Sequence, residues 1–407
     1  SALELRDGQG NVLEAEVLEA EVLGEEGKGP LFIWLISQYG HAEEPRAIGA
    51  ALVLRGAEVW LVDLLDSLLM ERTSDNVRNL EGEPVLALIE AAQRAVEGTS
   101  RPVVLVACDR MAAPALRGMR LWQARGVASS RLAGAVLFFP NLYRGNPVAG
   151  EDPELIGIAR ATNMPVFVMQ PELGTQRWRF AELLDALHAG GSAAWGWFLP
   201  QVRDFFYLHF EQPTPSEEQM TTQIPQRLFT AARLLAAAPH PSVPAPLDGA
   251  ADKAKGATSG LVMRKAPVEA PGFDLIDTRN RRLRLEDYRG KVLLVNFWAT
   301  WCPPCVHEIP SMNRLAAEYD PGRFEIVSIN FKEDAEHMRG FLKKVAVDFP
   351  VLLDPQGQAA RQWKVFAFPS SFLVDAQGRI RYSVNSAIAW DTDEVRQVVD
   401  GLIENTP

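Results

Sequence analysis

Cysteine is scarce in this 407-residue sequence, which contains only three. A scaffold held together by disulfides needs a much higher density of cysteine, so that class is excluded. Long apolar runs are also missing, because a stretch such as Leu31–Ile36 is far shorter than the roughly 20 apolar residues of a membrane-spanning helix. Basic residues do not outnumber acidic ones, and the net charge of −11 argues against non-specific binding to nucleic acid, which needs a positive surface.

What remains is an ordinary globular mixture with 47% hydrophobic and 23% charged residues. Its length indicates two or three domains. Prolines and glycines concentrate between Pro239 and Pro271, where large apolar residues are few, and this composition is typical of a linker. The sequence therefore predicts a domain over residues 1–238, a linker over 239–265 and a second domain over 266–407.

In the first predicted domain, short apolar runs alternate with longer amphipathic stretches. Continuous apolar runs bounded by turn residues are typical of strands that are buried on both faces of a parallel sheet. The pattern therefore predicts an α/β domain with a mainly parallel sheet. The apolar runs are Leu31–Ile36, Val59–Val62, Val103–Ala107, Ala133–Phe139 and Pro165–Met169, with helix patterns such as Val85–Val96 and Pro114–Arg125 between them.

The second predicted domain has the order β-α-β-α-β-β-α. Its last two strands flank an Asp/Gly turn at 375–378, which indicates a β-hairpin. The predicted elements are strand Val292–Phe297, helix Pro303–Tyr319, strand Phe324–Asn330, helix Ala335–Val345, strands Phe372–Val374 and Ile380–Val384, and helix Asp393–Ile403.

Cys302 and Cys305 stand where a predicted strand gives way to a helix. The start of a helix presents unpaired N–H groups and a positive dipole end, so the pKa of Cys302 should fall below the usual value of about 8.5. Cys305 lies one helical turn later, at a spacing that suits a disulfide with Cα atoms about 5.5 Å apart. Pro304 has no N–H, so the N–H of Cys305 and the dipole must stabilise the thiolate. The pair has the nucleophile and the resolving thiol that disulfide exchange requires.

Two other interpretations of this Cys-X-X-Cys pair compete with exchange. Half of a zinc site would need two further ligands at metal spacing, but the sequence has no second such pair. His307 is the only histidine nearby, and two helix positions after Cys305 it points elsewhere. A structural disulfide without turnover is the second alternative, and the redox interpretation is favoured over both.

These residues also resemble a known family. The segment Trp298–Cys305 resembles the active-site segment of thioredoxin-fold proteins, and Cys305–Pro310 is similar to the TlpA/ResA-type branch, the extracytoplasmic thiol–disulfide oxidoreductases of bacteria. Other similar segments follow the family's order: Gly272–Leu275, Leu285–Lys291 and Phe368–Gly378. The resemblance covers about residues 266–407 and implies a thioredoxin fold and an enzyme that uses no cofactor.

The resemblance assigns catalytic roles by position. Cys302 would attack the substrate disulfide and Cys305 would resolve the mixed disulfide. Glu308 would be a semi-buried acid that accepts the proton of Cys305 or raises the thiol pKa values by like-charge repulsion, the alternative being a solvated acid on the helix face. The sequence departs from thioredoxin at Asn296, where thioredoxin carries a buried aspartate. Since asparagine exchanges no proton, Glu308 is left as the acid within reach.

The resemblance also indicates a substrate-binding surface. Pro369 would be a cis-proline that faces the disulfide and helps to hold an extended substrate segment, the alternative being an ordinary trans turn. Trp301, Pro303 and Phe368 would contribute to the same surface. Many relatives have threonine where this chain has Phe368, and the bulkier ring would narrow the substrate groove.

Location and partners follow from the same resemblance. We expect a periplasmic or other extracytoplasmic protein that reduces protein disulfides, with protein substrates that carry disulfides or thiols. An upstream thiol donor is expected, and a membrane-bound donor is one option. The chain begins with Ser1 and Ala2, which is consistent with the removal of a leader or a membrane anchor.

The pattern of residues 1–238 resembles the three-layer α/β-hydrolase fold. In that family the nucleophile stands on a sharp turn between the central strand and a helix. Aligning the small residues after Val103–Val106 places Asp109 at the nucleophile position and Cys108 beside it, although Met111 stands where the turn needs a small residue.

A hydrolase triad would also need an acid and a histidine further along the chain. Glu172 and His209 are the candidates, but their spacings are poor. Asp109 is better explained as a helix cap, Cys108 as a buried apolar residue and His209 as a structural residue. We therefore predict a hydrolase-like domain without catalysis that positions the redox domain. The alternatives are an esterase-like hydrolase with an accessory thioredoxin domain, or a platform that binds partners and delivers them to the redox domain.

Overall fold

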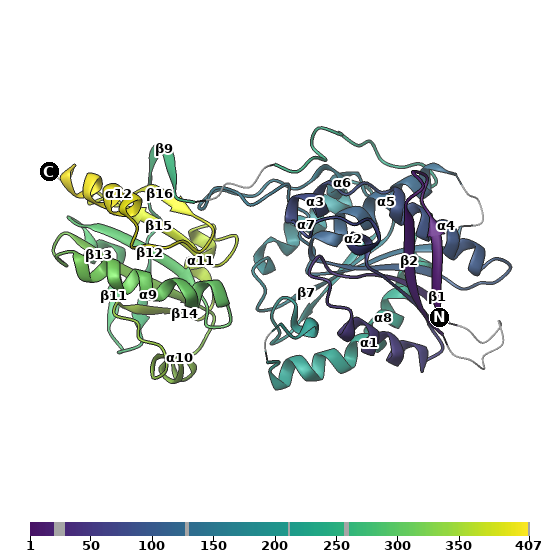
Figure 1. Ribbon diagram of the computed structural model, residues 1–407, viewed down its shortest axis with the longest axis horizontal. Helices are drawn as coiled ribbons and strands as arrows, with labels where there is room; N and C mark the ends of the chain where they lie inside the picture. Colours follow the sequence, from purple (N-terminus) through teal and green to yellow (C-terminus); the bar gives the residue numbers. More distant parts are fainter. Residues whose placement is uncertain (20–28, 127–129, 211, 256–259, 406–407) are drawn as a thin grey trace. The chain divides into compact units, whose positions relative to one another are not determined.

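The structure is a computed structural model that describes residues 1–19, 29–126, 130–210, 212–255 and 260–405 (Figure 1). It divides into two compact units: unit 1 comprises Ser1–Gly145 and Glu154–Gly256, and unit 2 comprises Asn146–Pro153 and Ala257–Pro407. Within the described residues, each unit has one eight-stranded sheet. In that same part of the chain, no helix has the length and apolar character that crossing a bilayer demands.

Unit 1 contains a mainly parallel sheet, as its sequence predicts. Strands β3 to β8 are parallel to one another, while β2 pairs antiparallel with β4 and with β1 at the edge of the sheet. The order across the sheet is β1 (Ala2–Arg6), β2 (Val12–Leu18), β4 (Glu58–Val62), β3 (Leu31–Leu35), β5 (Val103–Cys108), β6 (Leu132–Phe138), β7 (Val166–Pro171) and β8 (Ala194–Leu199).

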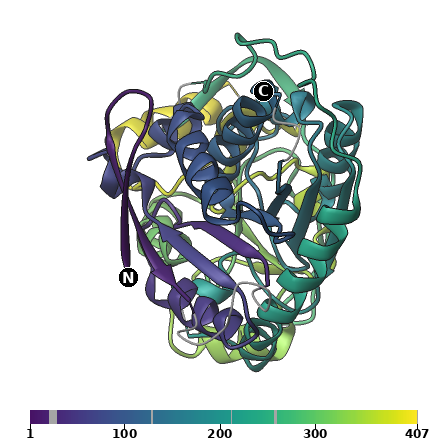
Figure 2. The same cartoon turned by 90° about the vertical axis from the view of Figure 1, so that its right-hand side faces the viewer.

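Helices cover both faces of this sheet (Figure 1, Figure 2). Alternate residues of β3 show why, since Ile33 packs with α4 and α5, whereas Phe32 packs with α1 and α8. A strand that is apolar on both faces requires such a three-layer arrangement. The helices are α1 (Glu43–Val53), α2 (Leu64–Ser67), α3 (Ser74–Asn79), α4 (Glu83–Ala95), α5 (Ala112–Ala124), α6 (Gly157–Ala161), α7 (Phe180–Ala189) and α8 (Pro215–Ala237).

The predicted linker differs from what the structure contains. Its first part packs on unit 1, where Asp252 is buried and accepts a 2.8 Å bond from Arg117. The carbonyl oxygen of Pro241 accepts a bond from Gln123 in the same unit. Residues 256–259 lie outside the described residues, and strand β9 (Val262–Glu269) begins within the predicted linker. Proline and glycine content identified a segment without a core of its own, but such a segment can still dock along a neighbouring surface.

Unit 2 has the expected elements and some additional ones. Strands β9, β10, β11 and β14 and helix α11 were not predicted. For β14 the reason is that four residues between two prolines give too short a pattern to recognise. The sheet order is β11 (Arg282–Arg284), β10 (Asp274–Asp277), β14 (Val351–Asp354), β13 (Phe324–Phe331), β12 (Val292–Trp298), β15 (Ser370–Val374), β16 (Arg379–Val384) and β9. The helices are α9 (Pro303–Glu318), α10 (Ala335–Leu342), α11 (Gln358–Gln362) and α12 (Asp393–Glu404).

The central strands of unit 2 bring several segments to one edge of the sheet. Strand β12 is parallel to β13 and antiparallel to β15, with Phe297 opposite Ser370. Helices α9, α10 and α12 share one core cluster, which includes Met312, Met338 and Val399. As a result, the end of β12, the end of β13 and the beginning of β15 meet beside the first turn of α9.

Candidate active site

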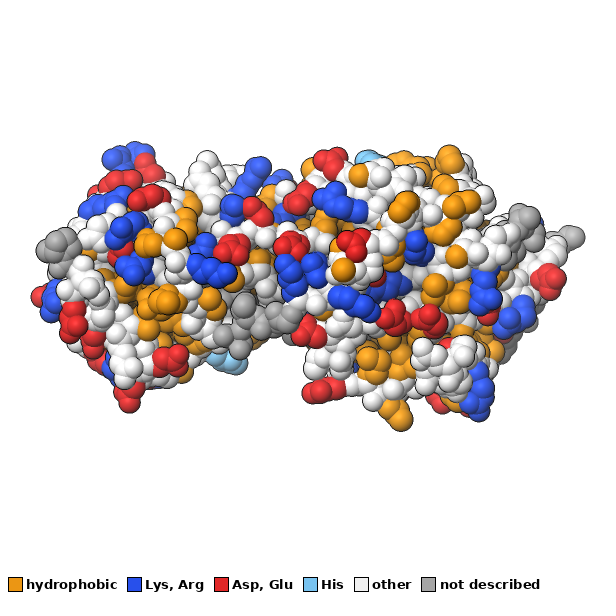
Figure 3. Space-filling view, turned by 90° about the horizontal axis from the view of Figure 1, so that it is seen from above, with side chains coloured by type: hydrophobic (Ala, Val, Ile, Leu, Met, Phe, Trp, Pro, Cys, Tyr) orange, Lys and Arg blue, Asp and Glu red, His pale blue; other side chains and the backbone are white. Residues whose placement is uncertain are grey.

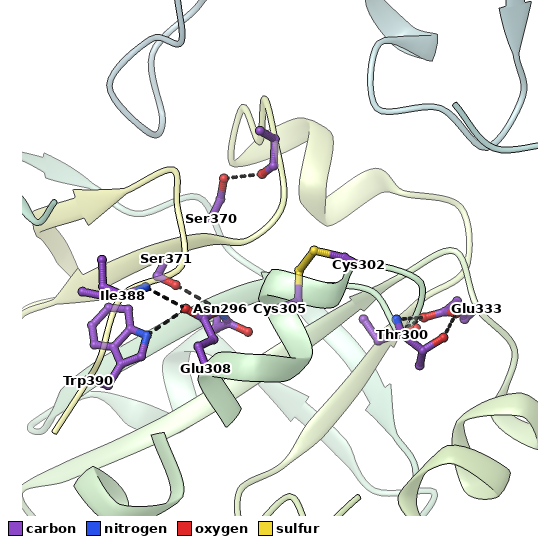
Figure 4. The surroundings of a disulfide bond; sticks show 12 residues. Asn296, Thr300, Cys302, Cys305, Glu308, Glu333, Ser370, Ser371, Ile388 and Trp390 are labelled. Carbon is purple, nitrogen blue, oxygen red and sulfur yellow. Dashed lines mark hydrogen bonds between the residues drawn. A yellow bond between two sulfur atoms is a disulfide. The ribbon is translucent and has the colours of Figure 1, made fainter. Parts of the chain in front are cut away.

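Cys302 and Cys305 form a disulfide at the junction between β12 and α9 (Figure 4). Their Cα atoms are 5.3 Å apart, close to the separation expected from the sequence. Cys302 is the N-cap residue of α9. Its exposed fraction is 6%, against 1% for Cys305, so an attacking sulfur reaches Cys302 more readily. The two cysteines therefore differ in exposure in the direction that the predicted roles require, and the roles themselves stay predictions.

The first turn of α9 contains the groups that are expected to stabilise a Cys302 thiolate. Pro303 and Pro304 occupy the first helical positions and are exposed. The N–H of Cys305 donates to the carbonyl oxygen of Cys302 at 3.0 Å in this oxidised form. Because the disulfide contains no thiolate, stabilisation of the reduced Cys302 by this N–H and by the positive end of the α9 dipole stays a prediction.

Glu308 is buried behind the disulfide, with an exposed fraction of 3%. Its carboxylate accepts bonds from Asn296 Nδ2 at 2.8 Å, Trp390 Nε1 at 3.1 Å and the Ile388 N–H at 3.4 Å (Figure 4). These bonds favour the ionised form, but burial outweighs them and raises the pKa of Glu308 to about 7. The alternative of a solvated acid on the helix face is wrong.

The bond between Phe368 and Pro369 is cis, which the resemblance implies. Because Ser370 pairs with Phe297 at the end of β12, the cis-proline lies at the same edge of the sheet as the disulfide. The Phe368 ring meets the edge of Trp301, with 5.9 Å between ring centroids, and lies 4.9 Å from the Phe331 ring. Phe331 was not predicted from the sequence. These rings form an aromatic border to the site.

Known proteins resemble unit 2. The AhpC/TSA family model matches residues 267–383. The thiol-disulfide oxidoreductase ResA of Geobacillus thermodenitrificans is 33% identical over 133 residues, which are 33% of this chain and 75% of that protein. The chain belongs to the ResA-type thiol–disulfide oxidoreductases.

Two further comparisons involve similar lengths of chain. ResA of Bacillus subtilis is 37% identical over 112 residues, which are 28% of this chain and 63% of that protein, less than two thirds of its length. A crystal structure of a thiol:disulfide interchange protein of the thioredoxin family from Chlorobium tepidum has 25% identity and a TM-score of 0.30. That similarity covers 34% of this chain and 99% of the other.

A second acid of the ResA-type unit, Glu333, was missed by the sequence analysis. It follows β13 and accepts bonds from the N–H and the hydroxyl of Thr300, just before the disulfide, and from Asn330 Nδ2 at 2.7 Å (Figure 4). His337 Nε2 lies 3.3 Å from the same carboxylate. Glu333 was detectable in principle, because parallel strands place the residues after their carboxyl ends side by side.

We expect the substitution Glu333→Ala to loosen the loop that carries Cys302. It leaves the N–H of Thr300 without its partner, and an unsatisfied donor of this kind costs about 1–3 kcal/mol. Urea unfolding of the full chain measures the loss. Glu333→Gln is the matched control, since its amide oxygen can still accept one bond from Thr300, and it should lose less. Equal unfolding free energies of wild type and Glu333→Ala would contradict the proposal that Glu333 holds the loop before Cys302.

The candidate nucleophiles of unit 1 lie where β5 ends and α5 follows. Cys108 is the last residue of β5, and burial raises its pKa to about 12, so it is not a thiolate at neutral pH. Asp109 has a φ of 48°, in the left-handed region that a sharp strand-to-helix turn imposes. Its carboxylate forms a 2.7 Å ion pair with Arg110.

The structure does not assemble a triad from the remaining candidates. Glu172 accepts a bond from the N–H of Gln201 at 3.0 Å. His209 is exposed, and among the hydrogen bonds of the described residues none joins it to Asp109 or Cys108. A nucleophile without an aligned histidine lacks the base that hydrolysis requires.

Proposed function

We propose that unit 2 reduces protein disulfides through Cys302 and Cys305. The position of Cys302 carries the proposal, because Cys302 caps α9 and is the more exposed residue of the bonded pair. In the reduced enzyme, the Cys302 thiolate attacks a client disulfide and releases one client thiolate. Cys305 then loses its proton and attacks Cys302, which releases the second client thiol and oxidises the pair to the disulfide.

The proposal gives the surrounding residues distinct roles. Glu308, three residues after Cys305 on the same helix, is suited to take the proton of Cys305 during resolution. Pro369 and the rings of Trp301 and Phe368 would hold the client segment beside the sulfurs. Pro303, exposed on the first turn of α9, would contribute to the same surface.

We infer that this exchange takes place outside the cytoplasm. The resemblance to the TlpA/ResA-type branch supports this location, and an upstream thiol donor would return the pair to its reduced form. Protein clients fit the surface better than nucleic acid does. On the face drawn in Figure 3, basic and acidic side chains are interspersed over both units, and the net charge is −11.

The reduction potential of the Cys302–Cys305 pair tests the proposed direction. A reductant should equilibrate with glutathione or dithiothreitol buffers near the value of thioredoxin, about −270 mV. A potential near that of a periplasmic oxidant, about −120 mV, would instead assign oxidation to the pair. After alkylation of the free thiols, separating the alkylated protein from the oxidised protein measures the ratio of reduced to oxidised pair at each buffer potential.

For unit 1 we propose a hydrolase-like domain that has no hydrolase activity and serves as a platform for the redox unit. Its strand order, its three layers and the turn at Asp109 support the fold. Two observations argue against catalysis: Asp109 is ion-paired with Arg110, and within the described residues no hydrogen bond joins His209 to either candidate nucleophile.

We expect the full chain to hydrolyse p-nitrophenyl esters no faster than buffer does. The reason is that the Asp109 carboxylate is held by Arg110 and that the Cys108 thiol stays protonated. Turnover that disappears in Asp109→Ala or Cys108→Ala would contradict this expectation and favour the hydrolase alternative.

A further inference from the structure

A short segment from the first half of the sequence belongs to the redox unit. Residues Asn146–Pro153, called the strap below, are part of unit 2, although the chain on either side of them is part of unit 1. The buried carbonyl group of Ala149 accepts bonds from Ser383 Oγ and from Arg264, both at 3.2 Å. Glu151 adds an ion pair with Arg264 at 3.1 Å. The strap is therefore fastened to β16 and β9.

The strap reaches the cis-proline through one side chain. Asn385 Nδ2 donates to the carbonyl oxygen of Pro147 at 2.7 Å. Since that carbonyl can only accept, the amide orientation of Asn385 is fixed, and its Oδ1 is an acceptor 2.7 Å from Ser370 Oγ. The single hydroxyl proton of Ser370 has a second acceptor, the carbonyl oxygen of Ala367 at 2.6 Å. Ser370, which Figure 4 labels, directly follows Pro369 in the sequence.

Ser371, the residue after Ser370, belongs to a different hydrogen-bond network. Ser371 Oγ accepts a bond from Asn296 Nδ2 at 2.9 Å, and Asn296 also donates to Glu308. Two consecutive serines thus connect the segment after the cis-proline to two different networks (Figure 4). Ser371 joins it to the buried acid, and Ser370 joins it to the strap through Asn385.

We propose that the strap helps to position the client-binding surface of the redox site. Asn385 is the positioning residue, because it connects the strap to the segment that begins with Pro369. The inference rests on the proposed role of Pro369 in holding a client segment. A chain cut to residues 257–407 would keep both cysteines and lose the acceptor that orients Asn385. Unit 1 supplies the chain at both ends of the strap, so under this proposal the strap is the part of the chain through which unit 1 would act on the redox site.

The substitution Asn385→Ala in the full chain tests this role. With insulin as the protein substrate, we expect KM to rise about tenfold, because the surface that holds the client is displaced. We expect kcat to stay within twofold, because the cysteines are unchanged. The reaction of the reduced pair with 5,5′-dithiobis(2-nitrobenzoate), a disulfide too small to need that surface, should stay within twofold. Asn313→Ala is the matched control, since the amide of Asn313 likewise makes two hydrogen bonds, in its case to the backbone of Ala346 and Asp348, away from Pro369.

Ser370→Ala breaks the same link from its other end. If Asn385 acts through Ser370, the double variant should lose no more client affinity than either single variant. Replacing residues 147–152 with a Gly–Ser sequence of equal length should reproduce the rise in KM. Additive losses, an unchanged KM, or equal losses for insulin and the small disulfide would each overturn the proposal.

Hydrogen exchange provides a readout that does not depend on activity. Asn385→Ala should speed exchange of the backbone amides in the strap and in residues 370–371, and Asn313→Ala should not. If the wild-type chain reduces no protein disulfide, the proposed function fails, yet this exchange pattern still shows whether Asn385 joins the strap to the cis-proline. Unchanged exchange in both segments would overturn the inference by itself.

Discussion

Replacing Cys302 with serine should abolish disulfide exchange and lower the rate of insulin reduction by at least about 10³-fold. A serine hydroxyl is not ionised at neutral pH and forms no disulfide, so no mixed disulfide with a client can arise. The more exposed position of Cys302 in the pair makes it the sulfur that a client meets first. The assay uses the full chain with dithiothreitol as electron source, and it follows the precipitation of the insulin B chain.

Cys305→Ser separates this role from a merely structural disulfide. It should also lose turnover, but it should accumulate a client bound to Cys302 that a reductant releases. Cys108→Ser is the matched control, because the third cysteine is buried in unit 1 and should leave the rate unchanged. Retention of activity in Cys302→Ser, or failure of Cys305→Ser to trap any client, would show that the pair is a static crosslink.

The redox pair could be located from the sequence because its geometry is local. A strand, two prolines and a three-residue spacing between cysteines fix the start of α9 and the separation of the sulfurs without any distant contact. The buried strands of unit 1 were recognisable for a similar reason, since each is a continuous apolar run. Local patterns therefore predicted the mixed α/β class of both units and the position of the cysteine pair at the start of α9, whereas Glu308 and Pro369 were inferred from the family resemblance.

What the sequence did not reveal depends on contacts between distant segments. Glu333 holds Thr300 across two parallel strands, and the strap reaches Asn385 over more than two hundred positions of sequence. Neither contact produces a periodic pattern in the sequence. A single acidic residue or a loop carbonyl gives the same sequence whether it is solvated or hydrogen-bonded to a distant residue. The docking of Asp252 on unit 1 was missed for the same reason, since it relies on Arg117 far earlier in the chain.

Glu308→Gln should slow the resolving step on the order of 10²-fold and change its pH dependence. Burial raises the pKa of Glu308 to about 7, so in the wild type the fraction able to take the Cys305 proton grows as the pH rises through that value. Glutamine has a similar shape but accepts no proton. Stopped-flow measurement of the release of a client thiol from preformed mixed disulfide should therefore show an inflection near pH 7 that the variant lacks.

The carboxyl group of Glu308 should also make the unfolding free energy depend on pH. The sign of this dependence is opposite to that expected for an acid in a salt bridge. Between about pH 4.5 and 7 the folded chain keeps the Glu308 proton that the unfolded chain releases, so the folded state loses stability as the pH rises. At about 1.4 kcal/mol per pH unit, the unfolding free energies of wild type and Glu308→Gln should diverge by about 3 kcal/mol over this window, in favour of the variant. Urea unfolding at a series of pH values measures the divergence. If the two slopes coincide, Glu308 is already ionised at low pH, and the inflection in the resolving step must come from the thiols instead.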